Sequence, residues 1–140
     1  MSEATPRVDR RPRILLIEDD PDMAALVGDS LTEAGYAVEH APLAEAGILP
    51  HWEVPFDAVI LDHRLPGMDG LEFLAWLRRW DTGTPVVFVT AFGSPALFAR
   101  AASLGAATLS KPFPMEELLD AIRGLLDARA TPGAKEARAG

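Results

Sequence analysis

The stretch ILLIEDD, residues 14–20, decides the fold of this chain, because four apolar residues end abruptly in three acidic ones. A continuous apolar run of this length indicates a strand that is covered on both faces, as in a parallel sheet between two layers of helices. The pattern returns at residues 56–62, which end in Asp62, and at residues 85–90, which end in Thr90. With shorter apolar runs at residues 36–40 and 106–109, the sequence predicts five strands.

Helix signals lie between these strands. Asp20 and Pro21 predict the start of a helix, because aspartate is a good N-cap and proline fits the first turn. Gly35 predicts its end, because glycine readily adopts the backbone conformation of a C-terminal cap. Similar start signals precede three later apolar repeats, at Asp69, Ser94 and Pro114. Four helices are therefore expected with clear boundaries.

The remaining connection, residues 42–52, contains Gly47 and Pro50, so we expect only a shortened helix there. Alternating strands and helices indicate an α/β fold, because right-handed crossovers place helices on both faces of a parallel sheet. Five such units predict a flavodoxin-like, doubly wound sheet with the strand order 2-1-3-4-5.

The length and composition fit one domain. The 140 residues include 49% hydrophobic and 24% charged residues, the net charge is -8, and there is no cysteine. Disulfides and thiol chemistry are therefore excluded, and the acidic charge argues against direct binding to nucleic acid. Without a run long enough to span a bilayer or a secretory signal, we expect a cytoplasmic protein with no membrane partner. We expect a flexible N-terminal segment (residues 1–12), a domain (13–128) and a flexible C-terminal tail (129–140).

Reactive side chains stand at the carboxyl ends of four predicted strands. In the predicted order, strands one, three, four and five are neighbours, and ligands bind beyond their carboxyl ends. Glu18, Asp19, Asp62, Thr90 and Lys111 should therefore gather at one edge of the sheet. Carboxylates crowded in this way favour a magnesium ion, which prefers hard oxygen ligands together with a phosphate. We predict Asp19 and Asp62 as direct ligands and Glu18 as a ligand through water, with manganese as a substitute ion.

The same residues suggest phosphoryl transfer. Aspartate can attack phosphorus to form an acyl phosphate, which makes Asp62 the predicted acceptor. The transfer depends on charge compensation of the phosphoryl oxygens. Lys111 would supply a positive charge and Thr90 a hydrogen bond.

Four motifs resemble the response-regulator receiver domains of two-component systems: ILLIEDDPDM, VILDHRLPGMDGLEFL, PVVFVTAFG and LSKPF. The resemblance covers about residues 13–127. It implies that Asp62 is the phosphorylated aspartate, that Glu18 and Asp19 are its acidic pair, and that the backbone carbonyl of Arg64 is a further metal ligand. It also assigns the signalling hydroxyl to Thr90 and the conserved-type lysine to Lys111, with a cis peptide bond before Pro112.

One position departs from the family pattern. Receivers often carry Tyr or Phe three residues before the lysine, as a rotameric switch, whereas this chain has Thr108. Another residue must then relay the signal, or the output differs. Arg64 and Phe92 lie two residues after Asp62 and Thr90, and we expect them to tune the lifetime of the phosphoryl group more than its addition.

The resemblance implies a signalling phosphoacceptor rather than an enzyme. Its partners would be a sensor histidine kinase or a histidine phosphotransfer protein, and an unknown downstream protein. The apolar helix at residues 94–104, with the last helix, is either a docking surface, homodimerisation included, or carries a simple core stripe of Leu97, Ala101 and Leu104.

The sequence also allows a comparison with three alternative functions. A pseudo-receiver would keep the fold and work without phosphorylation, and Thr108 keeps that reading open. Many aspartate-nucleophile phosphatases carry a second aspartate two residues on, where this chain has Arg64. A nucleotide-binding flavodoxin-like protein is disfavoured because the first loop is acidic rather than glycine-rich.

Overall fold

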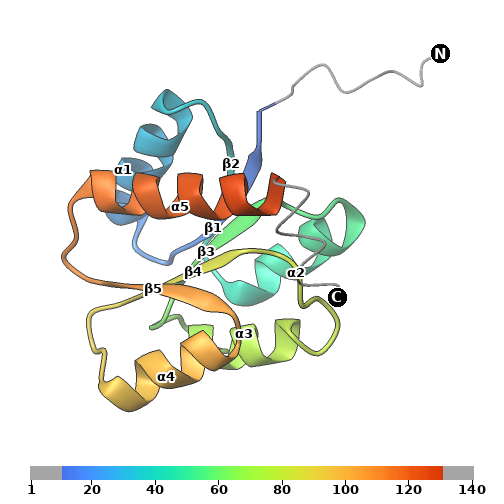
Figure 1. Ribbon diagram of the computed structural model, residues 1–140, viewed down its shortest axis with the longest axis vertical. Helices are drawn as coiled ribbons and strands as arrows, with labels where there is room; N and C mark the ends of the chain where they lie inside the picture. The colour runs from blue at the N-terminus through green and yellow to red at the C-terminus, as the bar shows by residue number, and fades with distance from the viewer. Residues whose placement is uncertain (1–10, 131–140) are drawn as a thin grey trace.

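The computed structural model describes residues 11–130, which form a five-stranded parallel sheet in the order β2-β1-β3-β4-β5 (Figure 1). Each strand is followed by a helix, which confirms the predicted fold class. The strands are β1 (Arg13–Ile17), β2 (Ala37–Ala41), β3 (Ala58–Asp62), β4 (Val86–Thr90) and β5 (Ala106–Ser110). The helices are α1 (Pro21–Glu33), α2 (Ala44–Glu53), α3 (Gly70–Leu77), α4 (Pro95–Ser103) and α5 (Met115–Ala130).

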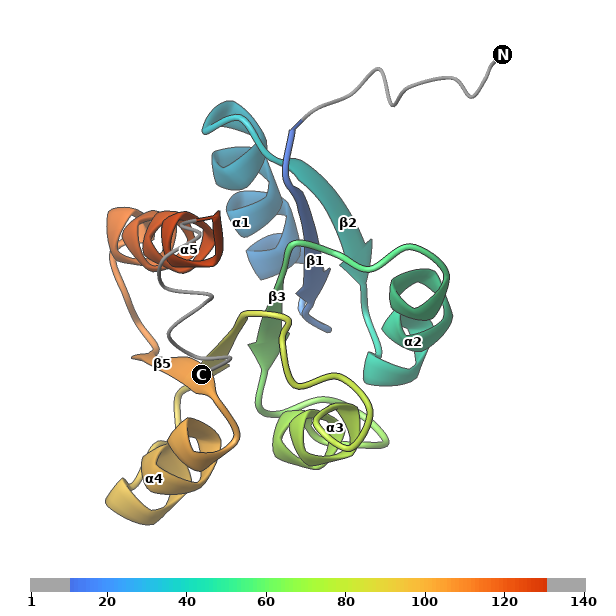
Figure 2. The ribbon, with the colours of Figure 1, turned by 45° about the vertical axis from the view of Figure 1, so that its right-hand side comes forward.

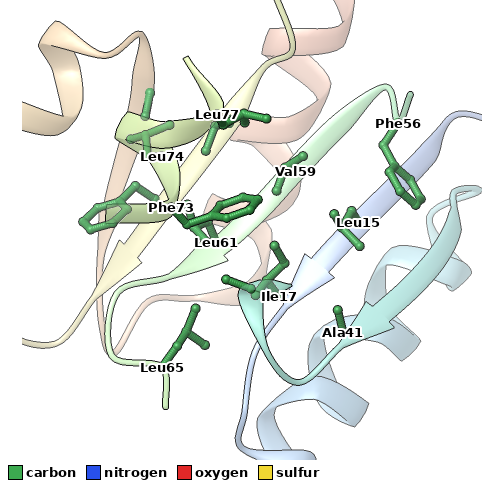
Figure 3. Close-up of a cluster of buried hydrophobic side chains, with 14 of the residues drawn as sticks. Leu15, Ile17, Ala41, Phe56, Val59, Leu61, Leu65, Phe73, Leu74 and Leu77 are labelled. Carbon is green, nitrogen blue, oxygen red and sulfur yellow. The ribbon is translucent and has the colours of Figure 1, made fainter. Parts of the chain in front are cut away.

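The sheet separates two apolar cores, as Figure 2 shows from the placement of the helices. Helices α1 and α5 cover one face, where Ile14 and Leu16 are buried. Helices α2, α3 and α4 cover the other face, where Leu15 and Ile17 pack with side chains of β3 and α3 (Figure 3). Because successive side chains of a strand point to opposite faces, both faces of the central strands must be apolar. This explains the uninterrupted apolar runs in the sequence.

The predicted helix starts are confirmed by their caps. The Asp20 carboxylate accepts hydrogen bonds from the first-turn amides of α1. Asp69 and Glu72 form a reciprocal capping box at the start of α3. The Ser94 hydroxyl accepts the Leu97 amide at the start of α4. These caps fix where α1, α3 and α4 begin after the carboxyl ends of the preceding strands.

Helix α2 differs from the prediction, because it runs through Gly47 and Pro50 rather than stopping at them. The reason is tertiary packing. A Cβ atom on Gly47 would lie 2.9 Å from Leu15 Cδ2, so glycine allows the helix to lie close against β1. The burial gained there outweighs the low helix propensity of both residues.

Strands β2, β4 and β5 differ from their predicted ranges by one residue, and two other boundaries differ by two residues. Strand β3 begins at Ala58 rather than Phe56, because the Phe56 amide donates to Nδ1 of His51 instead of joining the sheet. Helix α5 continues to Ala130, two residues into the predicted C-terminal tail, since alanine and arginine favour helix. Arg129 Nη1 also donates to the Asp57 carbonyl at 2.8 Å. The other predicted flexible residues, 1–10 and 131–140, lie outside the described part of the chain.

A polar network lies at the other end of the sheet from the acidic residues. The Asp81 carboxylate receives hydrogen bonds from His51 Nε2 at 2.7 Å and from the Thr84 hydroxyl at 2.6 Å. Burial acts to raise the pKa of Asp81, but hydrogen bonds from His51, Thr84 and Gly83 lower it to about 2. The network joins α2 to the loop that leads into β4.

Helix α4 contributes the predicted core stripe. Ala101 is buried, and Leu97 and Leu104 pack partly buried against the same core. The alanines at positions 96, 99 and 102 are exposed. Within residues 11–130, no helix has the length and apolar character that crossing a membrane requires.

Candidate functional site

The carboxyl ends of β1 and β3 bring three carboxylates together. Glu18, Asp19 and Asp62 each offer an oxygen within 4.8 Å of the others. Glu18 and Asp62 are buried, while Asp19 is exposed to solvent. The Asp20 amide donates to Glu18 Oε2 at 3.1 Å and orients that side chain. Ile17 at the end of β1 pairs with Leu61 of β3. This register brings the residues that follow the two strands side by side.

Lys111 reaches the same point from the end of β5. Its Nζ lies 2.7 Å from Asp62 Oδ1 and 3.5 Å from Glu18 Oε1. Its amide donates to the Thr90 carbonyl at 2.9 Å, which holds the residue beside β4. The following peptide bond, Lys111–Pro112, is cis, as the resemblance implied. Residues 93 positions apart in the chain, Glu18 and Lys111, therefore share one site.

The cluster contains more negative than positive side chains. Burial raises the pKa of Asp62, against the opposing effect of its bond to Lys111, and nearby Asp19 raises it further. Burial likewise raises the pKa of Glu18. Burial would lower the pKa of Lys111, but its contacts with Asp62 and Glu18 raise it overall. Three carboxylates facing one ammonium group leave excess negative charge, which a divalent cation would neutralise.

Thr90, at the end of β4, is 1% exposed and carries two hydrogen bonds on its hydroxyl. Oγ1 accepts the Phe92 amide at 2.9 Å and lies 2.9 Å from Nδ1 of His63. The sequence interpretation missed His63. The position of a polar imidazole ring directly after Asp62 could have marked His63 as a candidate. Its contact with Thr90, however, depends on tertiary structure.

The side chains of Arg64 and Phe92, which follow β3 and β4, contact each other. The Arg64 guanidinium carbon lies 4.2 Å from the centre of the Phe92 ring, a cation–π contact. Both residues are exposed, and Phe92 is 59% accessible. The role of the Arg64 carbonyl as a metal ligand remains a prediction.

Gly70 sets the distance between α3 and the end of β3. Its amide donates to the His63 carbonyl at 2.8 Å. A Cβ atom at this position would lie 2.1 Å from the Asp62 carbonyl oxygen. Any residue larger than glycine would displace the backbone here. Helix α3 can therefore begin directly beside Asp62, the last residue of β3.

A family model described as "Response regulator receiver domain" matches residues 14–123, a stretch that includes every residue of the site. The chain belongs to this family. The receiver resembles the transcriptional regulatory protein TcrA of Mycobacterium tuberculosis, at 40% identity over 116 residues. That match covers 81% of this chain and 45% of the relative. The receiver thus spans about half the length of the first curated relatives it matches.

The receiver also resembles proteins of its own size. The response regulator receiver protein CpdR of Brucella abortus is 35% identical over 117 residues, which cover 83% of this chain and 98% of that protein. The chemotaxis protein CheY4 of Vibrio cholerae has a similar structure, with a TM-score of 0.76, 29% identity and coverage of 82% and 98%. A CheY-like receiver from Methanospirillum hungatei gives a TM-score of 0.78, 30% identity and coverage of 85% and 96%.

Proposed function

We propose that Asp62 accepts a phosphoryl group in a magnesium-dependent step of a two-component phosphorelay. The observation that carries the proposal is the 2.7 Å contact between Asp62 Oδ1 and Lys111 Nζ, inside a cluster of three carboxylates. A nucleophilic carboxylate needs charge compensation on the phosphoryl oxygens rather than a base. Lys111 stands where it can provide that compensation.

The donor would be a phosphohistidine of a sensor kinase or of a histidine phosphotransfer protein. An Asp62 carboxylate oxygen attacks phosphorus and forms the new P–O bond. The P–N bond breaks, its electron pair returns to the imidazole nitrogen of the donor, and that nitrogen takes up a proton from solvent. Lys111 would then interact with a phosphoryl oxygen, and the Thr90 hydroxyl would donate a hydrogen bond to another.

The donor set fits a magnesium ion. Carboxylate oxygens are the hard ligands that magnesium prefers, and the three that converge here come from Glu18, Asp19 and Asp62. When bound, the ion would neutralise negative charge on the carboxylates and on the incoming phosphoryl group. The chain's own contribution is to hold these oxygens together at the ends of β1 and β3.

The output would be a change in protein contacts. We place the receiver in the cytoplasm, with an unidentified downstream protein or a second copy binding through α4 and α5. The exposed alanine face of α4 supports that surface. The alternative of a phosphorylation-independent pseudo-receiver gains support only from Thr108, whereas the cluster of three carboxylates with Lys111 supports phosphorylation.

Intact-mass measurement after incubation with acetyl phosphate and magnesium tests the proposal. We expect one added phosphoryl group, none in Asp62→Asn, and a rate lower by roughly a hundredfold or more in Lys111→Met, because one electrostatic stabiliser is lost. Asp19→Asn should require a higher magnesium concentration. Asp120→Asn is the matched control, because this exposed carboxylate lies outside the site and pairs with Arg123 on the same helix. A wild-type protein that never gains a phosphoryl group would refute the proposal.

A further inference from the structure

The hydroxyl of Thr90 is shielded from solvent, so its hydrogen must be donated inside the protein. Among residues 11–130, two groups contact Oγ1: the Phe92 amide at 2.9 Å and His63 Nδ1 at 2.9 Å. The amide can only donate, so it occupies an acceptor position on the oxygen. The imidazole nitrogen is therefore the available acceptor for the hydroxyl hydrogen, which requires the tautomer that carries the His63 ring proton on Nε2.

A threonine hydroxyl carries one hydrogen and can make only one donated bond. While that hydrogen is held by His63, it cannot be donated to a group on Asp62. A phosphoryl group on Asp62 would bring charged oxygens, which are stronger acceptors than a neutral imidazole nitrogen. The two acceptors would thus compete for the same hydrogen.

We propose that His63 is a positioning residue, which holds the Thr90 hydroxyl while Asp62 is unmodified and releases it when Asp62 is phosphorylated. This inference rests on the proposed phosphorylation of Asp62 and adds the side chain that responds to it. The backbone of His63 stays fixed, because its amide donates to the Val89 carbonyl and its carbonyl accepts the Gly70 amide. Release therefore changes the hydrogen bonding of the ring and not the path of the chain.

The contacts of the His63 ring show where the change would be felt. Its centre lies 5.3 Å from that of Phe88, with the rings tilted by 47°. Phe88 is fully buried in the core under α3 and α4, and it lies opposite Thr108 in the β4–β5 register. His63 thus reaches the neighbour of the position where receivers often have an aromatic switch. The imidazole would connect Thr90 to the face of the sheet that carries Phe88. The short side chain of Thr108 makes no such connection in our proposal.

Nitrogen NMR of the imidazole rings tests the proposal directly. In mildly alkaline buffer, Nδ1 of His63 should be an unprotonated, hydrogen-bonded nitrogen. Adding beryllium fluoride and magnesium, which mimic the aspartyl phosphate, should move this resonance towards that of a free unprotonated nitrogen. The chain has three histidines, so His63→Asn assigns the signal, and His51, bound to Asp81 at the other end of the sheet, serves as the reference. A protonated Nδ1 before addition, or an unmoved resonance after it, would overturn the proposal.

A pair of variants gives a second readout. His63→Leu removes the acceptor, so phosphorylation by acetyl phosphate should become roughly three- to tenfold faster, the equivalent of one ordinary hydrogen bond. His63→Asn should restore the slower rate, because its side-chain oxygen can accept the same hydrogen. Equal rates in the two variants would contradict the proposal. If the wild-type protein gains no phosphoryl group at all, the proposed function fails instead, so the two failures are distinguishable.

Discussion

At the scale of single residues, the site consists of buried groups and of an exposed pair of side chains from the loops that follow β3 and β4. Asp62 and Thr90 are buried, whereas Arg64 and Phe92 are exposed and contact each other. A cation–π contact at an exposed position is worth roughly 0.5–1 kcal/mol, enough to favour one arrangement without locking it. Because Arg64 and Phe92 follow Asp62 and Thr90 by two residues each, we expect the pair to limit the access of water to the site.

We predict that replacing both Arg64 and Phe92 with serine shortens the lifetime of the aspartyl phosphate. Loss of the pair should speed hydrolysis by about three- to tenfold, in keeping with the modest energy of the contact. The rate of phosphorylation by acetyl phosphate should change much less. Decay of the modified mass after removal of the phosphodonor gives the measurement. Arg64→Lys keeps the charge but loses the planar stacking, so it should fall between the two proteins. An unchanged decay rate in the double variant would argue against this role.

Sequence alone located the acidic residues, the threonine and the lysine, because each stands at the end of an apolar run that predicts a strand; the run before the lysine is the shortest of these. The parallel order of strands then places these ends at one edge. The contact between His63 and Thr90 could not be predicted, since it depends on the rotamers of two side chains from different strands. The pairing of Arg64 with Phe92 was hidden for the same reason, although both positions had been singled out.

At the scale of the elements, two glycines decide how closely helices approach the sheet. Gly47 lets α2 lie against Leu15, and Gly70 lets α3 begin beside the Asp62 carbonyl. Propensity predicted a helix shortened by Gly47 and Pro50, whereas packing required a glycine inside a longer helix. Local preference is a weak guide wherever a helix and a strand come this close.

We predict that Gly70→Ala destabilises the fold, because the new Cβ atom would meet a backbone oxygen that cannot move aside cheaply. The cost should be about 1–3 kcal/mol in free energy of unfolding, as for other overpacked sites. Gly124→Ala is the matched control on α5, where nothing lies within 4 Å of the added atom. That variant should be more stable by roughly 0.5–1 kcal/mol, because alanine favours helix. Urea unfolding of both variants measures the difference, and a Gly70→Ala protein as stable as the wild type would disprove the clash.

At the scale of the whole molecule, the two ends of the sheet have different tasks. The carboxyl ends carry the crowded carboxylates, and burial raises the pKa of Glu18 and of Asp62 there. The other end carries the His51, Asp81 and Thr84 network, in which Asp81 is well satisfied. The proposed chemistry and this hydrogen-bonded network therefore lie at opposite ends of the strands.

We predict that the network stabilises the protein at neutral pH and loses this effect in acid. The pKa of Asp81 is about 2 in the folded protein, below its ordinary value of 3.8, so the folded state favours the carboxylate. Its contribution is complete above the ordinary value and disappears as the pH falls through about 2. It amounts to about 2 kcal/mol at most, because the group is only partly buried. Urea unfolding of wild type and Asp81→Asn should show a difference in stability at about pH 7 that shrinks towards about pH 3. A difference independent of pH would exclude this origin.

The strand order also leaves two open edges, at β2 and β5, each only five residues long. Unpaired backbone groups at such an edge invite another chain to add a strand, which leads to aggregation. On β2, Glu39 and His40 are exposed, and a charged side chain on so short an edge opposes that addition. We therefore expect concentrated solutions of this protein to resist fibre formation from the β2 side.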